Sequence, residues 1–148
     1  LTKHFAIPGL RAGYLTACAE VMRLIRAQRM PWSVNALAVE AGFYALDEKF
    51  ALPFDLEAYL RLKDEFADDW RRTGLADVWD SDTHFFLLRL RSGKASALKD
   101  FLARRHGILI RDASNFEGLD AACFRLATQR REENRALIGA FMEWMTES

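Results

Sequence analysis

Apolar side chains recur every three or four residues in five segments of the chain, which is the spacing of helices. The predicted helices are residues 17–28, 34–46, 53–72 and 95–105, and a closing helix that begins after Thr128. The second of these is apolar almost all round, so we expect it to be buried.

Short polar residues mark where three of these helices are expected to begin. Ser33, Asp55 and Thr128 each precede a helical pattern and can accept a hydrogen bond from a free N–H of the first turn. Gly74 follows the longest helix, at a position where a left-handed residue ends many helices. The buried face of the closing helix is predicted to comprise Leu137, Phe141, Trp144 and Met145.

Runs of apolar residues bounded by turn residues predict five short strands. The predicted strands are residues 12–16, 78–79, 84–90, 108–111 and 123–127. From residue 53 onward the order is α-β-β-α-β-β-α, which predicts an α+β domain with an antiparallel sheet covered by helices. Polar residues interrupt the apolar pattern at residues 47–49, so we expect a domain boundary between about residues 46 and 53.

Composition limits the classes of partner. The 148 residues are 51% apolar, and 21 basic residues balance 21 acidic ones, which argues against a nucleic acid or an anionic membrane as partner. Cys18 and Cys123 lie among apolar residues, so both are expected in the core, and a cytoplasmic location fits them. The histidines lack the spacing of a metal site. No apolar run approaches the roughly 18 residues of a membrane span.

The first candidate for chemistry is a pair of cations near the start of the chain. Lys3 and Arg11 flank the turn signal Pro8-Gly9, so they can converge on one anion. An amine is the usual precursor of a Schiff base, and a guanidinium suits a phosphate. Pyridoxal 5'-phosphate carries both an aldehyde and a phosphate, so this pair predicts that cofactor.

Two further arginines lie among large apolar residues at predicted strand positions. A guanidinium there costs free energy unless an anion or a carboxylate meets it. For Arg111 or Arg125 alone, an ion pair with a neighbouring acid is the simpler explanation. Because both lie on neighbouring predicted strands joined by the polar loop 112–120, together they favour a doubly anionic substrate.

The segments Thr2-Lys3, Pro8-Gly9-Leu10-Arg11 and Gly13-Tyr14 resemble the cofactor-lysine motif of fold-type-I pyridoxal-phosphate enzymes. The resemblance is strongest to the branch that holds histidinol-phosphate aminotransferase and L-threonine-O-3-phosphate decarboxylase. It implies that Lys3 is the catalytic residue that binds the cofactor as a Schiff base, and that Arg11 binds the cofactor phosphate.

The resemblance continues in residues 108–111, 114–116 and 124–127. It implies that Arg125 holds the α-carboxylate of the substrate and that Arg111 lies near a substrate phosphate. One departure stands in the loop between them, where relatives commonly have proline at the position of an acidic residue, Glu117.

Residues 30–38 favour one relative over the others. They are very similar to the decarboxylase, whereas aminotransferases of the branch tend to have tyrosine at the position of Trp32. Trp32 is therefore expected to line the substrate pocket. The resemblance implies pyridoxal-phosphate-dependent decarboxylation of L-threonine O-3-phosphate to aminopropanol phosphate, in cobalamin biosynthesis. The alternatives are an aminotransferase for histidinol phosphate or a similar phosphorylated amino acid, and a non-catalytic α+β interaction module.

The resemblance also implies a domain organisation. Residues 1–46 would end the α/β pyridoxal-phosphate-binding large domain, and residues 47–148 would form the carboxy-terminal small domain. The acid that pairs with the cofactor ring, the aromatic that stacks on it and the glycine-rich loop of this family lie upstream of the lysine. We therefore expect a carboxy-terminal piece of a longer, homodimeric protein that is catalytically silent alone.

Overall fold

The computed structural model describes residues 1–2, 5–47 and 55–147 of the chain. The chain divides into two compact units, residues 1–54 and 55–148. Each unit is described by itself.

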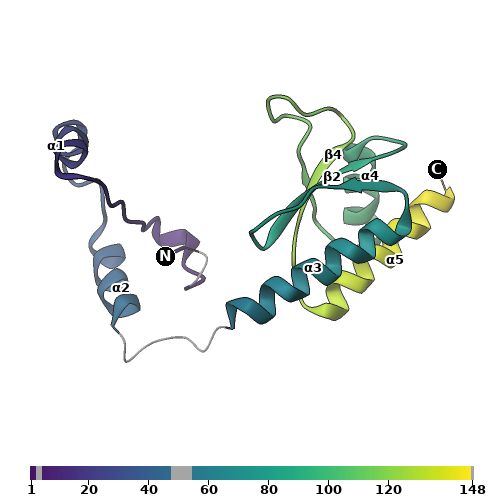
Figure 1. The fold of residues 1–148 in the computed structure, drawn as a ribbon, viewed down its shortest axis with the longest axis horizontal. Coiled ribbons are helices and arrows are strands. Elements are labelled where there is room, and N and C mark those ends of the chain that lie inside the picture. Colours follow the sequence, from purple (N-terminus) through teal and green to yellow (C-terminus); the bar gives the residue numbers. More distant parts are fainter. Residues whose placement is uncertain (3–4, 48–54, 148) are drawn as a thin grey trace. The chain divides into compact units, whose positions relative to one another are not determined.

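The described residues of the first unit form the 3₁₀ turn η1 (Pro8–Leu10), followed by helices α1 (Ala19–Gln28) and α2 (Ala36–Leu46) (Figure 1). Both predicted helices are confirmed to within two residues. The predicted cap of α2 is wrong, because Asn35 rather than Ser33 accepts a hydrogen bond from the backbone N–H of Ala38, at 2.8 Å. The hydroxyl of Ser33 instead accepts from Nε of Arg29 at 2.9 Å.

Three other predictions for the first unit are wrong. Residues 12–16 form no strand, since a strand needs a hydrogen-bonded neighbour and the described residues of this unit provide none. Helix α2 is not buried, because Ala38 is its only buried residue and Phe43 is 72% exposed. Cys18 is exposed as well. A unit of this size has too little chain to cover an apolar surface on every side.

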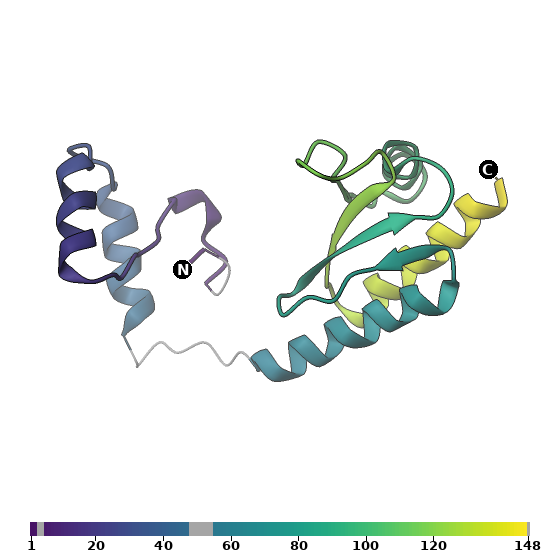
Figure 2. The same cartoon turned by 45° about the horizontal axis from the view of Figure 1, so that its top comes forward.

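The second unit confirms the predicted α+β order and the antiparallel sheet (Figures 1 and 2). Its sheet has the strand order β1-β2-β4-β3. Its elements are α3 (Leu56–Thr73), β1 (Ala76–Val78), β2 (Phe85–Leu90), α4 (Ala95–Phe101), the π-helical turn η3 (Leu102–His106), β3 (Arg111–Asp112), β4 (Cys123–Ala127) and α5 (Arg131–Glu147). Strand β3 is shorter than predicted, because only its last predicted residue and the one after it pair with β4.

The ends of α3 follow the sequence signals, whereas the start of α5 does not. The Asp55 carboxylate accepts from the N–H of Ala58 at 2.8 Å, and Gly74 ends α3 with a left-handed φ of 67°. At the start of α5 the Glu133 carboxylate accepts from the N–H of Arg130 at 3.0 Å. Thr128 is not the cap, because its hydroxyl is buried without a hydrogen-bond partner among the described residues.

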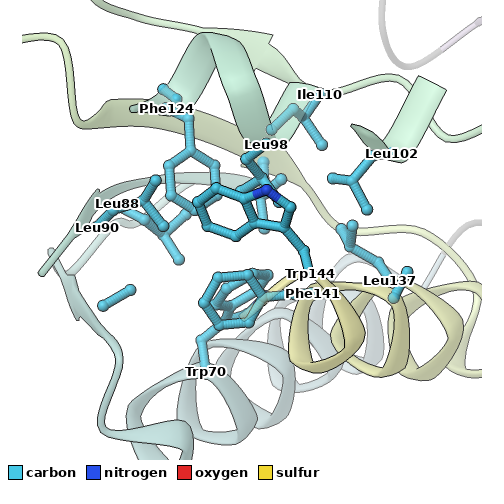
Figure 3. Close-up of a cluster of buried hydrophobic side chains, with 14 of the residues drawn as sticks. Trp70, Leu88, Leu90, Leu98, Leu102, Ile110, Phe124, Leu137, Phe141 and Trp144 are labelled. Carbon is cyan, nitrogen blue, oxygen red and sulfur yellow. The ribbon is translucent and has the colours of Figure 1, made fainter. Parts of the chain in front are cut away.

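One face of the sheet packs against the helices and forms the core (Figure 3). Trp70 of α3 lies at its centre, with its ring 5.7 Å from that of Phe124 and 4.5 Å from that of Phe141. Cys123, Trp70 and Trp144 are buried as predicted. Burying each large apolar side chain contributes about 1.5–3 kcal/mol, so this face carries most of the stability of the unit.

The opposite face of the sheet, which we call the open face, is half-buried or exposed along most of its length. Residues of one strand alternate between the two faces. The side chains that alternate with the core residues are Asp77, Phe85, Leu87, Arg89 and Arg125.

Among the described residues, no helix is both long and apolar enough to cross a bilayer.

Candidate anion-binding site

Arg111 of β3 and Arg125 of β4 are directly opposite each other in the antiparallel ladder. Directly opposed residues point to the same face of a sheet, with Cβ atoms typically about 4.5–5.5 Å apart. Two like charges in this arrangement repel and destabilise the pairing. The register therefore brings the two predicted substrate-binding arginines together.

Neither arginine forms an ion pair with a carboxylate in the described part of the chain. Other arginines of the same sheet region are paired: Arg89 with Asp120 at 2.8 Å and Arg91 with Asp77 at 2.9 Å. For each arginine alone, the sequence made an ion pair with a neighbouring acid the simpler explanation. No such ion pair forms among the described residues. The two positive charges of Arg111 and Arg125 remain available to an anion.

Aromatic rings, rather than acids, lie against the two guanidinium groups. The Arg125 guanidinium carbon is 4.8 Å from the centre of the Phe85 ring, and that of Arg111 is 5.3 Å from the centre of the Phe116 ring. Arg111 also donates a hydrogen bond to Oδ1 of Asn115 at 3.2 Å. A ring attracts a cation without neutralising it, so these contacts hold the groups while leaving their charge.

The loop between the two strands is fixed at both ends by its own aspartates. Asp112 accepts from the N–H of Ser114 at 2.9 Å, and bonding from Ser114 lowers the pKa of this carboxyl. Asp120 accepts from Arg89 and from the N–H of Ala122, and the bond from Arg89 holds the pKa of Asp120 below its usual range. Asp120 is thereby engaged by Arg89, and Asp112 interacts electrostatically with Arg111 without forming an ion pair with it.

A hollow of about 490 Å³ opens where the β3–β4 ladder ends, and both arginines line it. Upstream of Arg111, residues 108–110 are not part of the ladder, and they line the hollow together with the end of β4 and residues of α5. Glu133 and His106 also line this hollow. Its volume lies in the range of small-molecule sites.

In the first unit, Lys3 lies outside the described residues. The predicted turn at Pro8 forms as η1, and Arg11 follows it with a left-handed φ of 53°. The hydroxyl of Thr2 donates to the carbonyl of Ala12 at 3.4 Å. This bond joins the sequence neighbours of the two predicted cofactor-binding residues.

The donors of this segment fit a cofactor that carries a phosphate. Arg11 is exposed, and its hydrogen bond from Nη1 to the carbonyl of Pro8, at 3.0 Å, uses one of five guanidinium N–H groups. Trp32, the third predicted residue of this unit, is 97% exposed and has a positive φ of 59°, which is a rare conformation for a bulky residue. No described residue packs against the ring of Trp32.

Sequence reasoning did not single out the residues that support the arginines. Asn115 and Phe116 were seen only as part of a motif, and Phe85 only as a strand residue. The sequence does carry a signal for Phe85. Side chains alternate between the two faces along a strand, and this alternation places both Phe85 and Arg125 on the face opposite the core residues of their strands. The diagonal contact between them depends on the strand register, which the sequence does not state.

The chain matches the aminotransferase class I and II family over residues 1–141. It is 35% identical over 150 residues to the threonine-phosphate decarboxylase of Salmonella typhimurium, covering 99% of this chain and 40% of that protein. It is 28% identical over 142 residues to histidinol-phosphate aminotransferase 2 of Archaeoglobus fulgidus, covering 96% of this chain and 40% of that protein. The chain thus spans about 40% of the length of these relatives.

Solved structures show the same similarity. The L-threonine-O-3-phosphate decarboxylase of Porphyromonas gingivalis matches with a TM-score of 0.89 and 39% identity, covering 98% of this chain and 45% of that one. The histidinol-phosphate aminotransferase of Clostridium acetobutylicum matches with a TM-score of 0.84 and 28% identity, covering 99% and 44%. The chain therefore belongs to the aminotransferase class I and II family, a pyridoxal-phosphate-dependent family.

Proposed function

We propose that the whole protein is a pyridoxal-phosphate-dependent carboxy-lyase that converts L-threonine O-3-phosphate to aminopropanol phosphate, a step of cobalamin biosynthesis. One observation carries this proposal: Arg111 and Arg125 are opposed on one sheet face without a carboxylate partner among the described residues. A substrate with both a carboxylate and a phosphate would balance the two charges.

The two guanidinium groups have separate tasks in this proposal. Arg125 binds the α-carboxylate, and Arg111 binds the phosphate. A guanidinium can donate two parallel hydrogen bonds to either anion, which fixes the orientation of the substrate as well as its position. With both ends held, the bonds at the α-carbon keep a fixed orientation, and this orientation selects the bond that breaks.

Lys3 and Arg11 are the residues that would hold the cofactor, through its aldehyde and its phosphate respectively. The bond between Thr2 and Ala12 supports their convergence, because it closes the segment that joins them. When bound, the cofactor supplies an electron sink for cleavage at the α-carbon. Trp32 is proposed to line the substrate pocket of the whole protein.

Transamination of a phosphorylated amino acid remains the competing function, because the same four side chains could serve it. The higher identity to threonine-phosphate decarboxylases supports decarboxylation. The test is an assay of the full-length protein with L-threonine O-3-phosphate and with histidinol phosphate, with a 2-oxo acid present as amino acceptor, measuring carbon dioxide and keto product separately.

Carbon dioxide release from the first substrate, without keto product, is the expected result. Keto product from histidinol phosphate would assign the protein to the aminotransferases instead. The Lys3→Ala variant should lose both activity and the visible absorption of the bound cofactor. A protein that has neither in its unmodified form would fit the non-catalytic alternative.

A further inference from the structure

We infer that Phe85 and Phe116 are positioning residues, each of which holds one substrate-binding arginine without neutralising it. The inference rests on the proposed function and adds to it the residues that hold each arginine in position. Its basis is that each guanidinium, neither of which forms an ion pair among the described residues, lies near one ring, at 4.8 Å for Arg125 and 5.3 Å for Arg111.

A ring and a carboxylate hold an arginine with different consequences. A carboxylate fixes the guanidinium but occupies its N–H donors and cancels its charge. A ring lies against the face of the group, so the donors in the guanidinium plane stay free for a ligand. Arg105 illustrates the other case, because it lies 5.2 Å from the Phe101 ring and also pairs with Glu147 at 2.7 Å.

Phe85 is held rigidly by the sheet. It is paired with Ala127, two positions along β4 from Arg125, so ring and guanidinium are diagonal neighbours on the open face. The ring of His84 is nearly perpendicular to that of Phe85, with the two ring centres 5.1 Å apart. The position of Arg125 is therefore fixed by strands β2 and β4.

Phe116 is held by the loop instead. Its N–H donates to the carbonyl of Ala113 at 3.0 Å, and its own carbonyl accepts from Leu119 at 3.1 Å. Two consecutive turns thus set the backbone of Phe116, and Asn115 beside it accepts from Arg111. Arg111 is therefore held by residues of the loop, whereas Arg125 is held by a residue of the sheet.

The experiment uses the full-length protein carrying its cofactor and measures two affinities: the KM for L-threonine O-3-phosphate, which the protein turns over, and the constant for competitive inhibition by L-threonine. The second ligand lacks the phosphate and so reports on the carboxylate alone. The variants are Phe85→Leu and Phe116→Leu, with Phe101→Leu as the matched control for removing a ring from an arginine. Phe85→Tyr and Phe116→Tyr keep the rings.

Loss of a cation–π contact predicts roughly 3- to 30-fold weaker binding. Phe116→Leu should weaken binding of the phosphorylated ligand only, while Phe85→Leu weakens binding of both. Phe101→Leu and the two tyrosine variants should bind like the unmodified protein. If Phe85→Leu and Phe116→Leu also bind like it, the inference is wrong while the proposed function stands. An unmodified protein that binds neither ligand overturns the proposed function itself.

Discussion

Arg111 and Arg125 are directly opposed in the β3–β4 ladder, and no described carboxylate forms an ion pair with either of them. The ladder ends at this pair, and the hollow begins there. Like charges in opposed positions weaken a sheet, so this arrangement reduces the stability of the unliganded protein. An anion bound between them would recover that stability.

This repulsion predicts that Arg111→Gln stabilises the full-length protein in the absence of anions. Removing one of two opposed like charges should gain about 0.2–1 kcal/mol in the free energy of unfolding. Thermal unfolding in phosphate-free buffer measures it, with Arg91→Gln as the control, because Arg91 is paired with Asp77. Added inorganic phosphate should raise the midpoint of the unmodified protein more than that of Arg111→Gln. A larger phosphate effect in the variant would contradict this account of the pair.

Gly93→Ala is predicted to destabilise the second unit. Gly93 has a φ of 88°, and an added Cβ would lie 2.8 Å from Cη2 of the buried Trp144. Left-handed strain and overpacking together should cost about 1–3 kcal/mol. The matched control is Gly139→Ala, which meets no atom within 4 Å on helix α5 and should gain about 0.5–1 kcal/mol. Chemical denaturation compares them, and equal effects would refute the clash with Trp144.

Lys63→Met is predicted to loosen the β1–β2 connection. Lys63 is only 7% exposed, and its ammonium binds Asp64 and donates to the carbonyl of Ser81 at 2.6 Å. Methionine fills the same space but leaves that carbonyl without its donor, which should cost about 1–3 kcal/mol. Arg61→Met removes an exposed pair with Glu57 and should change stability by less than about 1 kcal/mol. Denaturant midpoints that do not distinguish the two variants would show that Lys63 does not anchor the connection.

The ionised carboxylate of Asp120 should make the stability of the folded protein fall at low pH. The hydrogen bond from Arg89 lowers its pKa below the usual 3.8, so the folded protein favours the ionised form. Its contribution is therefore present above 3.8 and is lost as the pH falls through the lower pKa of the folded state. Asp120→Asn should be less stable than the unmodified protein at neutral pH and should approach it in strong acid. A stability difference that persists in strong acid would mean that the charge of Asp120 is not the cause.

Much of the second unit could be predicted because its signals are local. Asp55 and Gly74 bound α3 by interactions within one turn, and the alternation in β2 needs only the pleat of a single strand. The start of α5 was misplaced because several polar residues compete there, and Glu133 reaches back to cap the helix where Thr128 was expected to. Such competition depends on side-chain geometry that a residue type alone does not give.

The first unit and the arginine site show what local signals miss. The apolar residues of α2 predict burial, but burial needs neighbours, which the described part of this unit does not supply. The sequence indicated that Arg111 and Arg125 belong together, since one polar loop joins their strands. It could not show that Phe85 and Phe116 hold them, because register and loop conformation decide those contacts.

The guanidinium groups of Arg111 and Arg125, which form no ion pair in the described part of the chain, are proposed to bind the two anionic groups of one substrate. The KM of the full-length protein for L-threonine O-3-phosphate tests this proposal most directly, comparing Arg111→Gln and Arg125→Gln with Arg91→Gln. Loss of a charge-assisted hydrogen bond predicts about 10- to 150-fold weaker binding for each of the first two variants. Arg91→Gln should bind like the unmodified protein. Equal affinities in all three variants would contradict the claim.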